Sequence, residues 1–210
     1  MVASPATEWS HLSPGGNAEQ DATIAIAGDR ARFPSVTIAA VFAEINALAD
    51  AGLVQSYALG GALAAVRYLE PVATQDVDVF VLFRPEDEAG LSPLAPIYDF
   101  LVRRGARPEG AHVVIGSWPV QVLPADDPLV RKALRAATSV TVEGQNVRVL
   151  SAEYLAAIAL DTGRAKDKIR VTQFLEWEGF NRSRFEQIVR SYPALLAKWA
   201  TFRRQFLNEA

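Results

Sequence analysis

Residues 57–61 read YALGG and residues 74–83 read TQDVDVFVLF. An apolar run that ends in two glycines and continues into alanine and leucine predicts a strand over 54–59, a glycine turn and a short helix over 62–69. The second stretch alternates like a strand, with valines on one face, so that Asp76 and Asp78 project together from the other. The expected unit is a glycine turn beside a strand that carries two carboxylates.

This unit suits phosphate chemistry. Glycines such as Gly60 and Gly61 let backbone amides approach a phosphate, and a following helix N-terminus adds a partial positive charge. Asp76 and Asp78 lie in an apolar strand, where two neighbouring negative charges are costly unless a cation such as Mg²⁺ compensates them and bridges to substrate phosphates. The alternative is a solvent-facing edge strand without a metal, and the strand pattern alone favours neither.

The spacing of hydrophobic residues predicts further helices and strands on both sides of this unit. An amphipathic helix is expected from Ser35 to the stop at Gly52. The further expected elements are a short strand (22–27), a helix (92–105), a hairpin (112–115 and 120–123), a helix (128–137), a second hairpin (140–142 and 147–150), and helices over 151–160, 166–177, from Ser183 with Glu186 as its capping box, and 193–207. In the last helix, the aromatic residues Trp199, Phe202 and Phe206 are expected in the core.

The amino-acid composition and the absence of certain motifs exclude several classes of protein and site. The chain has 210 residues, half of them hydrophobic, and lacks cysteine, which excludes a disulfide framework, a thiolate metal site and a cysteine nucleophile. Its two histidines, His11 and His112, are expected to be structural or incidental. No apolar run could span a bilayer and no leader is recognisable, which predicts a cytoplasmic protein. Gly60 and Gly61 lack the third glycine of a dinucleotide fingerprint, and the chain contains no Gly-x-Ser-x-Gly hydrolase elbow.

The YALGG and TQDVDVF stretches resemble the DNA polymerase β-type nucleotidyltransferase superfamily, especially the bacterial branch with the AbiEii and MenT toxins and minimal nucleotidyltransferases. The resemblance covers residues 36–178 and is strongest over 57–82. It implies an α+β fold: a mixed β-sheet flanked by helices, with a helical C-terminal extension. The expected organisation is a flexible N-terminal segment (1–33), a nucleotidyltransferase-like core (34–150) and a helical region (151–210).

The resemblance also implies roles for individual residues. Asp76 and Asp78 would be the catalytic Mg²⁺ ligands, while Gly60, Gly61 and Thr74 would lie around the nucleotide. A later stretch, VLSAEYL (149–155) followed by TGRAKD (162–167), is similar to the same branch. It implies that Lys166 faces the triphosphate and that Asp167 anchors it or a neighbouring amide, the alternative being ordinary first-turn helix charges.

One position departs from the family pattern. Many active members carry a third carboxylate on a later strand, flanked by apolar residues, where this chain has Gln121 between two valines. An amide binds cations more weakly than a carboxylate and cannot take a proton. Gln121 would therefore contact the nucleotide without acting as a base, and either Glu153 or Asp126 would replace the missing base or activity would be weakened.

Two functions follow from the resemblance. The first is Mg²⁺-dependent transfer of a nucleoside monophosphate from a nucleoside triphosphate to a hydroxyl of RNA, such as tRNA, or of protein, within a toxin–antitoxin system. The second is a catalytically silent module that binds nucleotide or a cognate toxin or antitoxin protein. Residues 161–210 hold 10 basic and 6 acidic side chains, which suits a polyanion, although a solvated helical surface is the commoner origin of such a bias.

Overall fold

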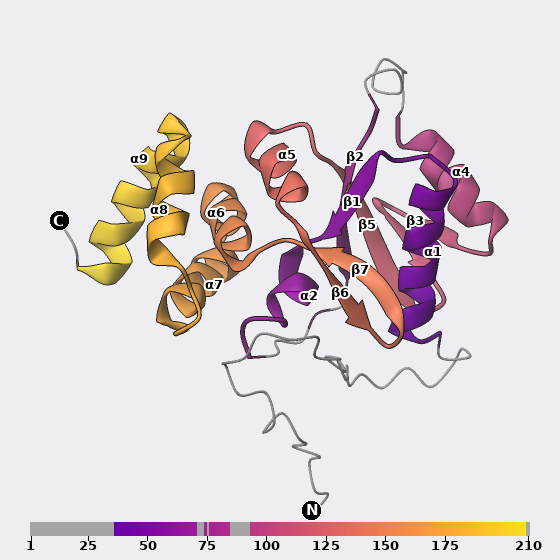
Figure 1. Ribbon diagram of the computed structural model, residues 1–210, viewed down its shortest axis with the longest axis horizontal. Helices are drawn as coiled ribbons and strands as arrows, with labels where there is room; N and C mark the ends of the chain where they lie inside the picture. Colours follow the sequence, from indigo (N-terminus) through magenta and orange to yellow (C-terminus); the bar gives the residue numbers. More distant parts are fainter. Residues whose placement is uncertain (1–35, 71–73, 75, 85–92, 209–210) are drawn as a thin grey trace, which may run out of the picture.

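The computed structural model describes residues 36–70, 74, 76–84 and 93–208. The expected strand over 22–27 and the expected helix start at Ser92 lie outside these residues. Figure 1 shows a central sheet with helices α1 and α4 on one side and helices α6 to α9 gathered on the other.

The sheet is mixed and has seven strands in the order β3-β4-β5-β2-β1-β7-β6. The strands are β1 (Ser56–Leu59), β2 (Val77–Leu82), β3 (Arg107–Glu109), β4 (His112–Ile115), β5 (Trp118–Pro124), β6 (Thr138–Val142) and β7 (Gln145–Val149). Strand β2 lies at the centre, antiparallel to β1 and parallel to β5. This mixed sheet with flanking helices confirms the predicted α+β class.

The helices follow the predicted order. They are α1 (Ile38–Asp50), α2 (Gly61–Ala65), α4 (Ala95–Arg103), α5 (Pro128–Arg135), α6 (Ala152–Thr162), α7 (Ala165–Glu176), α8 (Arg182–Arg190) and α9 (Pro193–Phe202), and the last continues into a π-helical turn (Arg203–Leu207). Helix α6 packs against α5, α7, α8 and α9. It therefore joins the C-terminal helices to the sheet.

Two local predictions were wrong, and one strand was not predicted. Helix α2 ends at Ala65 instead of Leu69, because the following residues turn so that the Tyr68 hydroxyl can donate to the Leu150 carbonyl, 3.0 Å away. Strand β3 went unpredicted because it is exposed and lacks apolar alternation. Helix α8 is capped by Asn181, whose side chain accepts from the Arg184 amide at 2.9 Å, whereas Glu186 pairs with two arginines of its own helix.

The C-terminal aromatic residues form a packed row. The rings of Phe185 and Trp199 lie 5.0 Å apart, and Phe202 stacks on both Trp199 and Phe206. Trp199 and Phe202 are buried, as predicted, but Phe206 keeps 47% of its surface exposed. This row holds α8 and α9 together, so its rings serve packing.

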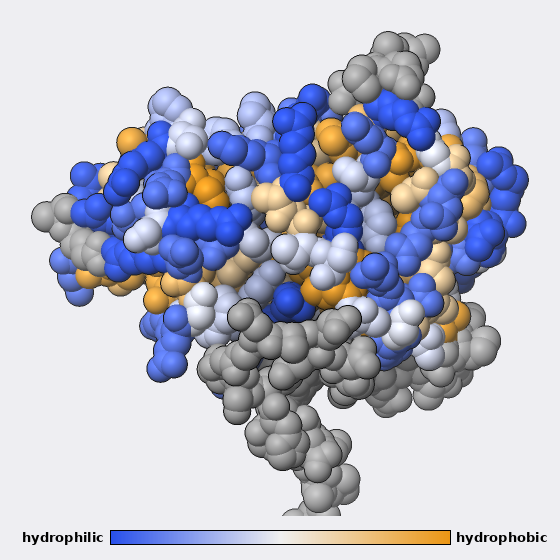
Figure 2. Space-filling view, in the orientation of Figure 1, coloured by the Kyte–Doolittle hydropathy of each residue, from blue (hydrophilic) through white to orange (hydrophobic). Residues whose placement is uncertain are grey.

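Polar residues cover most of the visible surface. Figure 2 shows hydrophilic side chains over both the helical part and the sheet, with small hydrophobic areas between them. Within the described part of the chain, no helix is both long and apolar enough to cross a membrane.

Candidate functional site

The glycine turn and the aspartate strand meet directly. The Gly60 amide donates to the Asp78 carbonyl at 2.9 Å, so this amide belongs to the sheet and is not free to bind a phosphate. Gly61 has a φ of +59°, and a Cβ placed on it would lie 1.7 Å from Oδ2 of Asp78. Glycine is required at position 61 by both its conformation and the carboxylate packed against it.

The second carboxylate lies beside the first on the same side of the chain. Asp76 precedes β2 by one residue, and its Oδ1 is 3.1 Å from the Thr74 hydroxyl, which also lies 3.2 Å from the Asp76 carbonyl. On the neighbouring strand, Gln121 is the register partner of Asp78. Partners on adjacent strands share a face, so Gln121 presents its amide on the side of the carboxylates.

Two clefts open over this face of the sheet. The smaller, about 410 Å³, is lined by Gly61, both aspartates and Gln121, and by residues of helices α5, α6 and α7. The larger, about 560 Å³, lies between the hairpin of β3 and β4 and helix α7, and Thr74 lines it. The clefts share Asp76 and Lys166 among their lining residues. Asp76 therefore lies where the two clefts meet.

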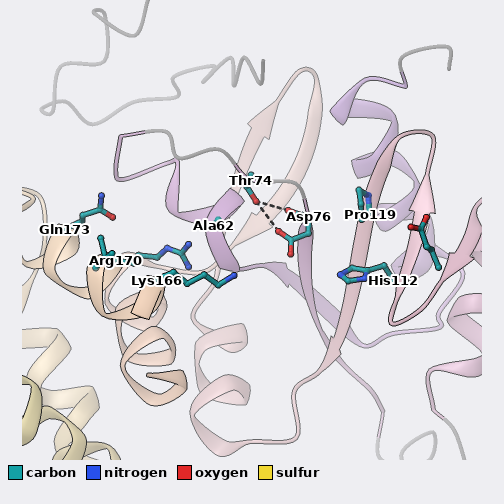
Figure 3. A pocket seen from close by; sticks show the side chains of 10 residues that line it. Ala62, Thr74, Asp76, His112, Pro119, Lys166, Arg170 and Gln173 are labelled. Carbon is teal, nitrogen blue, oxygen red and sulfur yellow. Dashed lines mark hydrogen bonds between the residues drawn. The ribbon is translucent and has the colours of Figure 1, made fainter. Parts of the chain in front are cut away.

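Helix α7 supplies the positive charge of the site. Lys166 and Arg170 lie one helical turn apart and line both clefts, as Figure 3 shows for the larger one. Asp167, between them, is only 1% exposed. Its carboxylate accepts from the Arg164 side chain at 2.6 Å and from the Arg164 amide at 3.3 Å, and it lies 3.9 Å from Arg170. Asp167 thus orients the first turn of the helix and its cations.

The charges of the two elements act on each other. Burial, and then the neighbouring charge of Asp76, raise the pKa of Asp78, while Lys166, Arg170 and Arg164 oppose this rise. Among the described residues, no ion pair involves either Asp76 or Asp78. The carboxylates therefore carry negative charge that is compensated only from across the cleft, which is the condition for attracting a cation.

Comparison with known proteins identifies the architecture. No protein-family model and no curated protein matches the sequence. A solved structure of an antigenic nucleotidyltransferase-like protein from Paracoccidioides brasiliensis is similar, with a TM-score of 0.53 at 11% identity over 81% of this chain and 87% of that chain. The chain has a nucleotidyltransferase-like fold.

Two further likenesses involve one antibiotic-resistance factor. ANT(2'')-Ia in complex with adenylyl-2''-tobramycin has a TM-score of 0.41 at 18% identity, over 81% of this chain and 99% of that chain. The solution structure of ANT(2'')-Ia has the same TM-score and identity, over 81% of this chain and 94% of that chain. The nucleotidyltransferase-like assignment of the fold comes from the first comparison alone.

The residues present fit a partly built cation site. Asp76 and Asp78 offer carboxylate oxygens on one face, as Mg²⁺ prefers, but within the described residues no group of three or more acidic or histidine side chains is placed to hold a metal. The position beside Asp78, where a third carboxylate would complete such a group, holds Gln121. Two carboxylates suit a Mg²⁺ ion that takes its remaining ligands from water and substrate phosphates.

The replacement bases expected from the sequence lie elsewhere. Glu153 is 7% exposed on α6, where its carboxylate accepts from the Ser151 hydroxyl at 2.8 Å, and it lines neither cleft. Asp126 is exposed and also lines neither. Arg170, which was not expected in the site, lines the larger cleft, and so does His112, which was expected to be structural or incidental. Arg170 was detectable, since it follows Lys166 by four residues and so shares its helix face.

Substituting alanine at Gly61 is expected to destabilise the protein by at least about 2 kcal/mol, because the new Cβ combines strain at positive φ with a clash against Asp78. Urea denaturation measures this loss. Gly144 in the turn between β6 and β7 is the matched control: its φ is +75°, and an added Cβ would meet nothing within 4 Å, so Gly144→Ala should cost only about 1 kcal/mol. Equal losses in the two variants would contradict the contact with Asp78.

Proposed function

We propose that the protein is a Mg²⁺-dependent nucleotidyltransferase that moves a nucleoside monophosphate from a nucleoside triphosphate to a hydroxyl group. The observation that carries this proposal is the contact of the Asp78 carboxylate with the glycine turn, opposite the cations of α7. Lys166 and Arg170 suit the negative oxygens of a triphosphate. Asp76 and Asp78 would hold Mg²⁺, which, when bound, neutralises phosphate charge and polarises the bond that breaks.

Each part of the site has a role in this proposal. Gly61 leaves room for the Asp78 carboxylate, Thr74 orients that of Asp76, and Asp167 fixes the helix turn that carries the cations. Gln121 offers an amide to the nucleotide or its water shell. Gly60 acts through shape, since a Cβ there would lie 2.3 Å from the Phe80 ring.

The acceptor is proposed to be RNA, such as tRNA, or a protein, in a toxin–antitoxin setting. This finer assignment is supported by the resemblance of the YALGG and DVD stretches to the toxin branch and by the basic balance of residues 161–210. Part of this positive charge is neutralised within α8, because Arg182 and Arg190 form ion pairs with Glu186. The cations of α7 are therefore the better candidates for contacts with a polyanion.

The decisive experiment supplies each α-labelled nucleoside triphosphate with Mg²⁺ and either total RNA or the protein encoded by the neighbouring gene. We expect label to appear on one acceptor class. Nucleotide binding without transfer to any acceptor would instead establish the silent binding module, which the neutral Gln121 favours. Failure to bind nucleotide would contradict the transferase and a nucleotide-binding module, and would leave only a module that binds a cognate toxin or antitoxin protein.

Glutamate at position 121 is expected to strengthen metal binding and raise the transfer rate about tenfold. The substitution Gln121→Glu replaces an amide by a carboxylate of the same shape beside Asp78, and a carboxylate binds Mg²⁺ better. Titration with Mg²⁺ in the labelled transfer assay measures the change. Gln173→Glu, in the larger cleft on α7, adds the same charge away from Asp78 and should leave the Mg²⁺ dependence unchanged.

A further inference from the structure

The sheet places His112 in the same row as the Asp78 carboxylate. Successive pairs of β4 and β5 are Ile115 with Trp118, Val114 with Pro119 and Val113 with Val120. The next position in this register places His112 beside Gln121, which is itself the partner of Asp78. Residues of one row share a face of the sheet, so the imidazole lies on the side of the carboxylates, two strands away from Asp78.

The same row brings a carboxylate to the other side of the histidine. Glu109 on β3 is the register partner of His112, and directly opposed side chains have Cβ atoms about 5 Å apart. Both residues line the larger cleft. The row of side chains therefore continues from Gln121 through His112 to Glu109.

The larger cleft connects this pair to the proposed metal site. Asp76 and Lys166 line it as well, and Figure 3 shows the imidazole of His112 turned into the cleft on the side of Asp76. Arg170 faces it from α7. A molecule in this cleft would therefore border the Asp76 carboxylate on one side and the imidazole on another, with the cations of α7 opposite.

The site lacks a base where the family pattern has one, because the Gln121 amide cannot accept a proton. We propose that the larger cleft holds the acceptor and that His112 is the general base of the transfer, an inference that rests on the proposed function. The neutral imidazole takes the proton of the acceptor hydroxyl while the oxygen of that hydroxyl attacks the α-phosphorus of the nucleoside triphosphate. A bond forms between that oxygen and phosphorus, the bond to the β-phosphate oxygen breaks, and pyrophosphate leaves with the electron pair.

Kinetics of His112→Ala test this role in the labelled transfer assay. We expect kcat to fall about 100-fold, as for loss of a general base, with the KM for the nucleoside triphosphate unchanged. Added imidazole should restore part of the rate, and the rise of kcat with pH on the acidic side should disappear. A histidine needed only for structure would show no imidazole rescue and an unchanged pH profile, and that result would overturn the proposal.

A binding measurement distinguishes failure of the proposed role of His112 from failure of the proposed nucleotidyl transfer. His11→Gln leaves His112 as the only histidine, so one imidazole signal can be followed by NMR while Mg²⁺ and a nonhydrolysable nucleoside triphosphate analogue are added. We expect that signal to shift when the acceptor class labelled in the transfer assay is added to the complex with the analogue. Binding of the acceptor without a shift overturns the role of His112 and leaves the proposed function standing, whereas absence of nucleotide binding overturns both.

Discussion

Replacing both Asp76 and Asp78 by asparagine is expected to lower the rate of nucleotidyl transfer by at least on the order of 10³-fold. In the proposed function these two carboxylates hold Mg²⁺, and electrostatic stabilisation of this kind is a large term in catalysis. The labelled transfer assay at saturating nucleotide measures the loss. Full activity in the double variant would exclude the site.

The same variant should remain folded. Because burial and Asp76 raise the pKa of Asp78, the folded state binds a proton more tightly than the unfolded state, and ionisation of Asp78 costs stability as pH rises past its ordinary pKa. At neutral pH the asparagine variant should therefore unfold at the same temperature as the wild type or higher. Added Mg²⁺ should raise the unfolding temperature of the wild type alone, since binding stabilises the folded state.

Removing the two cleft cations together is expected to weaken nucleotide binding by about 100-fold or more. Each hydrogen bond to a charged group contributes about 1.5 to 3 kcal/mol, and Lys166 and Arg170 are the cations that line both clefts on α7. Titration of Lys166→Gln/Arg170→Gln with a nonhydrolysable nucleoside triphosphate gives the Kd.

Lys168 provides the matched control on the same helix. It lines neither cleft, and its ammonium lies 5.7 Å from the centre of the exposed Phe206 ring. Lys168→Gln removes an equal charge and should leave the Kd nearly unchanged. Equal weakening in both variants would show that the net charge of α7, and not the placement of its cations, governs binding.

In the proposed reaction the two clefts have different roles. The smaller cleft contains Gly61, both aspartates, Gln121 and the buried anchor Asp167, which are the parts that suit a triphosphate and its cation. The larger cleft adds His112 and Glu109 from the sheet edge. A donor in one space and an acceptor in the other would meet at Asp76.

The sequence alone determined those helices, strands and turns that depend on only a few neighbouring residues. The alternation around Asp76 and Asp78 fixes which side of β2 the carboxylates occupy, and the paired glycines fix a turn before it, because side-chain period and backbone freedom depend on only a few neighbouring residues. The two hairpins and most helices are specified in the same way. The resemblance of these stretches to a nucleotidyltransferase also anticipated the fold.

Tertiary structure decided which of these elements form the site. His112 joins the row of Asp78 only through the register of β4 on β5 and of β5 on β2, and Arg170 reaches the cleft through the packing of α7 against α6. Glu153, attractive in the sequence, is instead buried on α6. Local patterns set the face of each element, but pairing between distant segments is set by the packing of the whole core, which no single stretch of sequence encodes.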